Sequence, residues 1–337
     1  MNLPVPLARA AKRWPVLTIA ALVASLAAAA SVGSGAAAAR ALPKAPKNIT
    51  LDVGYIGTNG LFTGPEGFAY SRGLLQKWLK PAGVTSIQTA GFANGPLQTA
   101  ALIGGSVNLG LLGDTPGLIA YSQGTSDRLI NQYGVDNEAW IVARPGITSL
   151  SQLVGKTVAV QPESYMDRYL QGLLAQQGLT GKVDRVAMLL TAAIPAVEAG
   201  SIDAVVVPPT EALPLTSQGY PIVVKSVTTP KLQGTGLTVV STSLLSADPG
   251  IVKAWNAARD KAIAYAKAHA SAYYAYAATT QTGATAAQEK EFSPLSDYPT
   301  KPFTKSGLAQ LQGTLNFLVS QGDATAFSIK AWEAKGS

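Results

Sequence analysis

The sequence contains no cysteine and one histidine among its 337 residues. The lack of cysteine excludes disulfides, thiolate metal sites, thiol nucleophiles and a lipid-modified N-terminal cysteine. With His269 as the only imidazole, no His/Cys metal site can be assembled, and a Ser–His–Asp triad would have to use this residue. His269 lies within an apolar helical stripe, which favours a packed or half-exposed side chain over a catalytic base.

Motifs that mark hydrolases and nucleotide-binding proteins are also missing from the sequence. There is no Gly-x-Ser-x-Gly elbow, no Walker loop, and no Gly-x-Gly-x-x-Gly after the first predicted strand. Charged residues make up 13% of the chain, and the basic ones are scattered, without the stripe that nucleic acid requires. Carboxylate chemistry stays open, although no close acidic pair in the predicted strand-end loops suggests it. We therefore expect no catalytic residue, no metal, no cofactor and no nucleic-acid partner.

The first forty residues differ in composition from the rest. Arg9, Lys12 and Arg13 precede an Ala-rich apolar run over residues 14–39 that ends in small residues. This pattern predicts a signal peptide over residues 1–41, cleaved near residues 39–41. A retained membrane anchor is the alternative, since the run is long enough to span a bilayer. Cleavage after Ala41 would lower the formal net charge from +7 to +3. An exported protein without lipid or disulfides fits a bacterial periplasm.

A repeated segment is the most informative pattern in the remaining chain. Residues 105–116 and 200–211 each begin with Gly-Ser, continue through Val or Ile to Asn or Asp, form a short apolar run and end in a Pro-containing loop. Each follows an Ala-rich helical stretch. A helix–turn–strand unit used twice, in a chain long enough for about two domains, predicts two similar α/β lobes. Ligands of such sheets bind beyond the carboxyl ends of the strands.

The alternation of predicted strands and helices indicates largely parallel sheets. We expect a strand over residues 49–56 and helices over residues 68–80, 248–278 and 304–321. Strands over residues 220–225 and 238–241 are expected to complete the smaller lobe and carry the chain back. Thr304 is the expected N-cap of the last helix and Gly322 its stop.

Five loops precede helices and supply candidate ligand contacts. Helix N-termini bind oxyanions without a buried Lys or Arg, because their first N–H groups are unpaired and the dipole is positive there. Helix capping is the alternative for each Ser, Thr or Asn alone. Arg168 shares a helical face with Ser164 and can pair with an anion or remain solvated. Asp114 can contact a ligand amine, cap a helix or stabilise a loop. The loops contain Thr58, Asn59, Asn94, Gly95, Asp114, Thr115, Ser164, Tyr165 and Thr191.

Three segments carry a resemblance to a known family. The runs GLLGDTPGLIAYSQG, ITSLSQLVGKTVAVQPESYMDRYLQGLLAQQGL and AVEAGSIDAVVVPPTEALPL resemble solute-binding proteins of ABC importers, in the group typified by aliphatic sulfonate, taurine and nitrate binders. The similarity covers about residues 48–275. The chain departs from the family in having Pro208 and Pro209 where an aromatic residue is usual, and it lacks the Cys-rich motif of thiamine-precursor relatives. By position, the resemblance implies ligand contacts at Thr58, Asn59, Asn94, Gly95, Asp114, Thr115, Ser164, Tyr165 and Thr210.

The resemblance implies a bilobal type II periplasmic binding fold with two hinge crossovers. The expected lobes are residues 42–140, 141–235 and, returning to the first lobe, 236–337. The expected function is capture of a small anionic, sulfonate-like solute by a monomeric receptor, which then delivers it to an ABC permease. An enzyme on the same scaffold is the alternative, and a membrane-anchored sensor lobe follows if the leader is retained.

Overall fold

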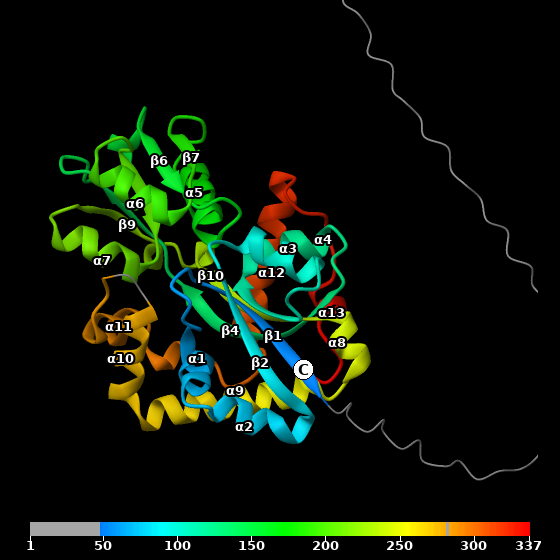
Figure 1. Ribbon diagram of the computed structural model, residues 1–337. Coiled ribbons are helices and arrows are strands. Elements are labelled where there is room, and N and C mark those ends of the chain that lie inside the picture. Colours follow the sequence, from blue (N-terminus) through cyan, green and yellow to red (C-terminus); the bar gives the residue numbers. More distant parts are fainter. Residues whose placement is uncertain (1–47, 281–282) are drawn as a thin grey trace, which may run out of the picture. The chain divides into compact units, whose positions relative to one another are not determined.

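The computed structural model describes residues 48–280 and 283–337. These residues form two five-stranded sheets with helices packed on them (Figure 1). Each sheet forms the centre of one lobe. The expected signal peptide, residues 1–41, lies outside the described residues. No helix within the described ranges has both the length and the apolar character needed to cross a membrane.

Lobe 1 is built on the sheet order β2-β1-β3-β10-β4. The first three strands are parallel, and β10 is antiparallel to both of its neighbours. The strands are β1 (Ile49–Ile56), β2 (Val84–Phe92), β3 (Leu109–Gly113), β4 (Asp127–Asn137) and β10 (Gly234–Ser241).

Lobe 2 repeats this plan in the order β7-β6-β8-β5-β9. Here β5 is the strand antiparallel to both neighbours. The strands are β5 (Trp140–Ala143), β6 (Thr157–Val160), β7 (Asp184–Ala187), β8 (Ala204–Val207) and β9 (Ile222–Lys225).

The chain crosses between the lobes after β4 and again after β9, so β5 and β10 are the strands that arrive from the other lobe. Each runs against the sheet it joins. The prediction of largely parallel sheets is confirmed by β1–β3 and β6–β8, and β5 and β10 are the antiparallel exceptions. The strand expected at residues 238–241 is part of β10, which carries the chain back into lobe 1, and β9 completes lobe 2.

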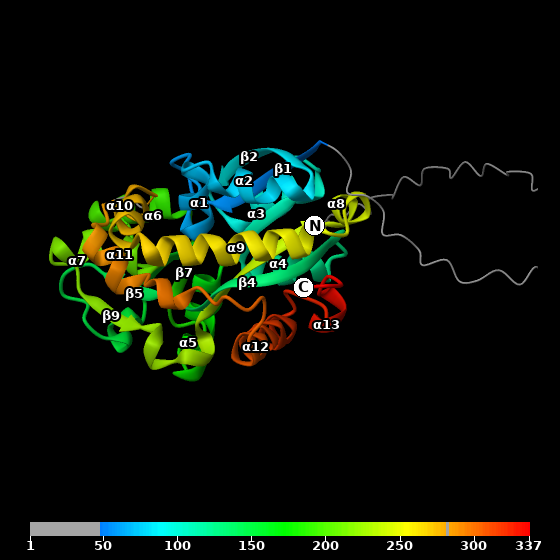
Figure 2. The same ribbon diagram turned by 90° about the horizontal axis from the view of Figure 1, so that it is seen from below.

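Helices cover both faces of each sheet. In lobe 1, α1, α2 and α9 pack on one face, and α3, α4, α12 and α13 on the other; Figure 2 shows α9 running along this lobe. In lobe 2, α5 covers one face, and α6 and α7 the other. The helices are α1 (Gly64–Ser71), α2 (Leu74–Leu79), α3 (Gly95–Ile103), α4 (Asp114–Ser122), α5 (Tyr165–Gln176), α6 (Leu190–Glu198), α7 (Pro209–Ser217), α8 (Thr242–Ala247), α9 (Ile251–Ala268), α10 (Ala270–Thr280), α11 (Ala286–Phe292), α12 (Lys305–Gln321) and α13 (Ile329–Trp332).

The repeated segment forms the central strand of each sheet, β3 and β8, which confirms two similar lobes. The Asn or Asp of the repeat accepts a backbone hydrogen bond from the adjacent strand in both copies. The side-chain oxygen of Asn108 accepts the backbone N–H of Asp52 at 2.9 Å, and a carboxylate oxygen of Asp203 accepts that of Thr157 at 2.9 Å. Each bond ties the start of the repeated strand to the adjacent parallel strand, β1 or β6.

Two helices predicted as continuous are interrupted. Gly73, with φ of 68°, separates α1 from α2, and α1 begins at Gly64, four residues before the predicted start. His269 separates α9 from α10 with φ of −124° and ψ of 42°, and its side chain is exposed rather than packed in the apolar stripe. The last predicted helix is confirmed: Thr304 accepts the Gly307 N–H at 2.9 Å, and Gly322 ends α12 in the left-handed conformation.

Candidate functional site

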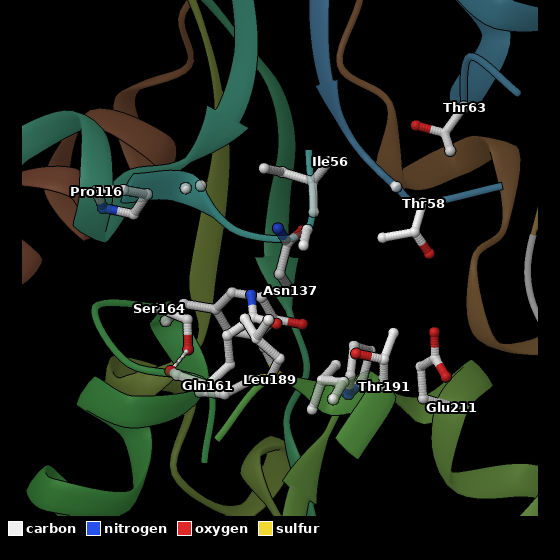
Figure 3. A pocket seen from close by; sticks show the side chains of 18 of the residues that line it. Ile56, Thr58, Thr63, Pro116, Asn137, Gln161, Ser164, Leu189, Thr191 and Glu211 are labelled. Carbon is white, nitrogen blue, oxygen red and sulfur yellow. Dashed lines mark hydrogen bonds between the residues drawn. The ribbon is translucent and has the colours of Figure 1, made fainter. Parts of the chain in front are cut away.

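A cavity of about 240 Å³ lies between the two lobes (Figure 3). It is lined by the loops after β1, β2 and β3 on one side and by those after β6, β7 and β8 on the other. These are the carboxyl ends of the parallel strands, where α/β sheets bind ligands. A cavity of this volume suits a small solute.

The first turns of six helices line this interlobe cavity, three from each lobe. The N-terminal end of a helix carries the positive end of its dipole, so all six helices present that end at the cavity. In Figure 3, Thr63 and Pro116 approach from lobe 1, and Ser164, Thr191 and Glu211 from lobe 2. The first-turn and N-cap residues at the cavity are Thr63 of α1, Gly95 of α3, Gly113 and Pro116 of α4, Ser164, Tyr165 and Met166 of α5, Leu189, Leu190 and Thr191 of α6, and Pro208 and Glu211 of α7.

Carboxylates are the charged side chains of this cavity. Glu163 and Glu211 line it, and no Lys, Arg or His does so among the residues that the structure describes. Burial raises the pKa of Glu211. Glu163 has a φ of 53°, an uncommon conformation for a residue with a side chain. An anion bound here would therefore be held by neutral N–H and O–H donors rather than by a cation.

Two tyrosines stand at the crossovers and border the cavity. A Cβ at Gly236 of β10 would lie 2.4 Å from the ring of Tyr133, and one at Gly234 would lie 2.5 Å from Tyr165, so glycine is required at both positions. The Tyr165 hydroxyl donates to the carbonyl of Glu138 at 3.2 Å. Burial raises the pKa of both phenols, which keeps them protonated at neutral pH.

Six of the eleven candidate contacts line the interlobe cavity. Two come from the β1–α1 loop, one from the start of α3, and three from lobe 2. Ser164 also caps α5 by accepting the Asp167 N–H at 3.2 Å, so capping and a cavity position coexist. The six are Thr58, Asn59, Gly95, Ser164, Tyr165 and Thr191.

The other five candidates are engaged within the protein and do not line this cavity. Asn94 caps α3. Asp114 and Arg168, both fully buried, face one another at 3.7 Å, and Arg168 donates to the carbonyl of Gln233 at 2.7 Å. Thr115 is 2% exposed and donates to Asp114. Thr210 is 4% exposed and borders a neighbouring cavity of about 170 Å³.

The position of Asn94 yields a direct test of its role. Its side chain accepts the Leu97 N–H at 2.9 Å, so Asn94→Ala is expected to lower the free energy of unfolding by about 1 kcal/mol through loss of the cap. Asn94→Asp keeps an acceptor and should retain most of that stability. Urea unfolding of both variants measures the difference, and equal stability of wild type and the alanine variant would contradict capping.

Several residues that line the interlobe cavity were not predicted from the sequence. Thr63 went unnoticed because α1 starts earlier than its apolar spacing indicates, although Gly64-Pro65 is a helix-start signal. Asn137 lies at the end of β4. Thr280 ends α10, far along the sequence from the other lining residues. No local pattern marks Asn137 or Thr280.

The fold matches that of known periplasmic binding proteins. The aliphatic sulphonate binding protein SsuA from Escherichia coli is 22% identical over 86% of this chain and 98% of its own, with a TM-score of 0.69. The alkanesulfonate-binding protein SsuA from Xanthomonas axonopodis pv. citri, bound to MOPS, is 21% identical over 84% and 96%, with a TM-score of 0.70. The desulfurization enzyme DszB, as a mutant in complex with biphenyl-2-sulfinic acid, is 17% identical over 86% and 97%, with a TM-score of 0.63.

The expected bilobal type II periplasmic binding fold is thus confirmed. The sequence model described as NMT1/THI5 like matches residues 92–272, more than half of the chain. The chain belongs to the NMT1/THI5-like family. No curated protein matches the sequence.

Proposed function

We propose that this protein is an exported solute receptor of an ABC importer. The observation that carries the proposal is the interlobe cavity, lined by the N-terminal turns of three helices from each lobe. A solute bound there contacts both lobes, so binding favours the closed over the open arrangement. The closed monomer then delivers the solute to a membrane permease. Nothing in this cycle alters the solute chemically.

A small organic anion of the sulfonate type is the proposed solute. The six helix N-termini offer donors to an anionic head without a buried cation, and the SsuA proteins of similar fold are named for sulfonate binding. For the periplasmic location we propose cleavage of residues 1–41, which sequencing of the mature N-terminus tests. For the lobes we propose residues 42–140 and 236–337 against residues 141–235.

Ligand-induced stabilisation tests this proposal. Unfolding is followed by urea in the presence of propanesulfonate, taurine, nitrate and, as a cationic comparison, choline. A true ligand at 100 times its Kd should raise the free energy of unfolding by about 2.7 kcal/mol. Thr191→Trp, which fills the cavity from α6, should abolish the effect, and Thr180→Trp, at an exposed turn of lobe 2, should keep it. No stabilisation by any anion would refute the anionic assignment.

An enzyme is the second candidate, because DszB shares the fold. The interlobe cavity offers Glu163, Glu211, Tyr133 and Tyr165 as titratable groups, and His269 is outside it. Mass spectrometry of the bound compound before and after incubation distinguishes the two candidates: a receptor returns it unchanged.

A further inference from the structure

A second, smaller cavity of about 140 Å³ lies inside lobe 1, between α1, α10 and α11. It shares Ile56, Thr63, Tyr133 and Thr280 with the interlobe cavity. We call it the acidic recess, because its charged side chains are Glu66 and Glu289. The two cavities therefore adjoin at this shared wall.

The two carboxylates of the recess differ in their partners. Glu66 is paired with Arg259, whose Nε lies 3.0 Å from its Oε1. Glu289 belongs to α11 and is 4% exposed, and its Oε1 has no hydrogen-bond partner among the described residues. Burial, and secondarily the charge of Glu211, raise the pKa of Glu289 to about 7. A buried carboxylate without a partner is costly in its charged form.

The position of Glu211 extends this acidic surface toward the interlobe cavity. Glu211 lines that cavity from α7 of lobe 2, and α7 packs against α11, which carries Glu289 (Figure 1). Two incompletely paired carboxylates thus approach the shared wall from opposite lobes. The helix N-termini around Gly95 and Ser164 supply neutral donors elsewhere in the same cavity. The combined space is suited to a molecule with an acceptor end and a donor end.

We propose that the acidic recess is a subsite for the ammonium group of the solute, which Glu289 binds from within and Glu211 at the mouth. This inference rests on the proposed receptor function and makes the solute a zwitterion. The ammonium group supplies the N–H donors that the Glu289 oxygen lacks and offsets both negative charges. Ligand binding and lobe closure are thereby coupled, because the two carboxylates belong to different lobes.

A matched pair of probes tests the subsite. Calorimetry at pH 7.5 compares 3-aminopropanesulfonate with propanesulfonate, which differ only in the amino group. The wild type is expected to bind the amino compound about tenfold more tightly, the scale of one charge-assisted hydrogen bond. Glu289→Gln should remove most of this preference and still bind propanesulfonate, which has no ammonium group for this carboxylate to hold. Glu291→Gln, an exposed change on the same helix, should leave both affinities unchanged.

The pH profile of the wild type gives an independent readout. The ammonium group requires the ionised carboxylate, so the preference for the amino compound should increase from pH 5.5, rise most steeply around pH 7 and level off about one pH unit higher. The ionisable groups around Glu289 are Glu211 on α7, Glu66 on α1, Arg259 on α9, Tyr273 on α10 and Tyr298. Equal affinity for the two probes at every pH, or an unchanged preference in Glu289→Gln, overturns the subsite. Failure of both probes to bind the wild type overturns the receptor proposal instead.

Discussion

Replacement of Asp114 by alanine is expected to lower the free energy of unfolding by about 3–5 kcal/mol, as when a buried ion pair loses one partner. Asp114 is 0% exposed and begins α4. It accepts from the backbone N–H of Thr235 at 3.0 Å and from the hydroxyl of Thr314 at 3.1 Å. The guanidinium of Arg168 lies 3.7 Å away. Alanine would leave that cation in the interior without a counter-charge and would remove the acceptor of the Thr115 and Thr235 N–H groups.

This network joins the lobes at the hinge, which gives the same substitution a functional effect. Asp114 belongs to lobe 1, Arg168 to α5 of lobe 2, and Gln233, whose carbonyl Arg168 binds, to the second crossover. Burial lowers the pKa of Arg168, and the charge of Asp114 acts against that shift. Loss of the carboxylate should therefore loosen the hinge and weaken ligand binding, although Asp114 does not line the cavity.

Urea unfolding measures the expected loss. Asp184→Ala, which removes an exposed carboxylate of β7, serves as the control and should change stability by less than about 0.5 kcal/mol. Asp114→Asn keeps an acceptor and should fall between the two. A loss below 1 kcal/mol for Asp114→Ala would mean that Arg168 gains solvent in the variant, and the network would then not stabilise the hinge.

The presence of two similar lobes was predictable because the sequence repeats one pattern of helix, turn and short apolar strand. β3 and β8 are short apolar runs because both faces of each sheet are buried: Val205 and Val207 face the cluster under α6 and α7, and Ala204 and Val206 face α5. The loops after these strands carry small and polar residues, so the general position of the site followed from the same patterns.

The individual ligand contacts were less predictable, because one residue type serves several roles. Asp114 and Arg168 have the chemistry of ligand-binding residues, yet their partners within the protein, Thr314 and Gln233, are distant in sequence. Only the folded chain shows that these groups are already paired. The acidic recess depends on Glu289 of α11, and local sequence does not distinguish this buried carboxylate from the exposed Glu291 on the same helix.

The break between α9 and α10 also lacks a local signature, unlike the break at Gly73 between α1 and α2. The apolar stripe continues from α9 into α10 at three- and four-residue spacing, and His269 between them is compatible with a helix. The bend is set by tertiary packing: Tyr273 and Tyr276 of α10 contact the ring of Phe68 on α1. Because α10 then leads to Thr280 at the cavity, this bend positions part of the site.

Removal of the Arg259 side chain is the second change with a large expected effect. Arg259 is 1% exposed, pairs with Glu66 at 3.0 Å and donates to the carbonyls of Tyr133, at 3.1 Å, and Pro299. Arg259→Met should lower the free energy of unfolding by about 3–5 kcal/mol at neutral pH, because Glu66 is left buried without a partner. The double variant with Glu66→Leu should recover much of that loss, since no uncompensated charge remains.

The pH dependence of the free energy of unfolding distinguishes the unpaired Glu66 carboxylate from a simple packing defect as the cause of the loss. Burial already raises the pKa of Glu66, and Arg259 acts in the opposite direction, so the single variant should raise that pKa further. Between the ordinary glutamate pKa of about 4.3 in the unfolded chain and the higher native value, the native state binds the extra proton, and its stability falls as pH rises. The deficit of Arg259→Met should therefore be small near pH 4.5 and grow toward pH 8. In the double variant it should not vary with pH. A pH-independent deficit in the single variant would show that the lost contacts to Tyr133 and Pro299, rather than the isolated carboxylate, destabilise the protein.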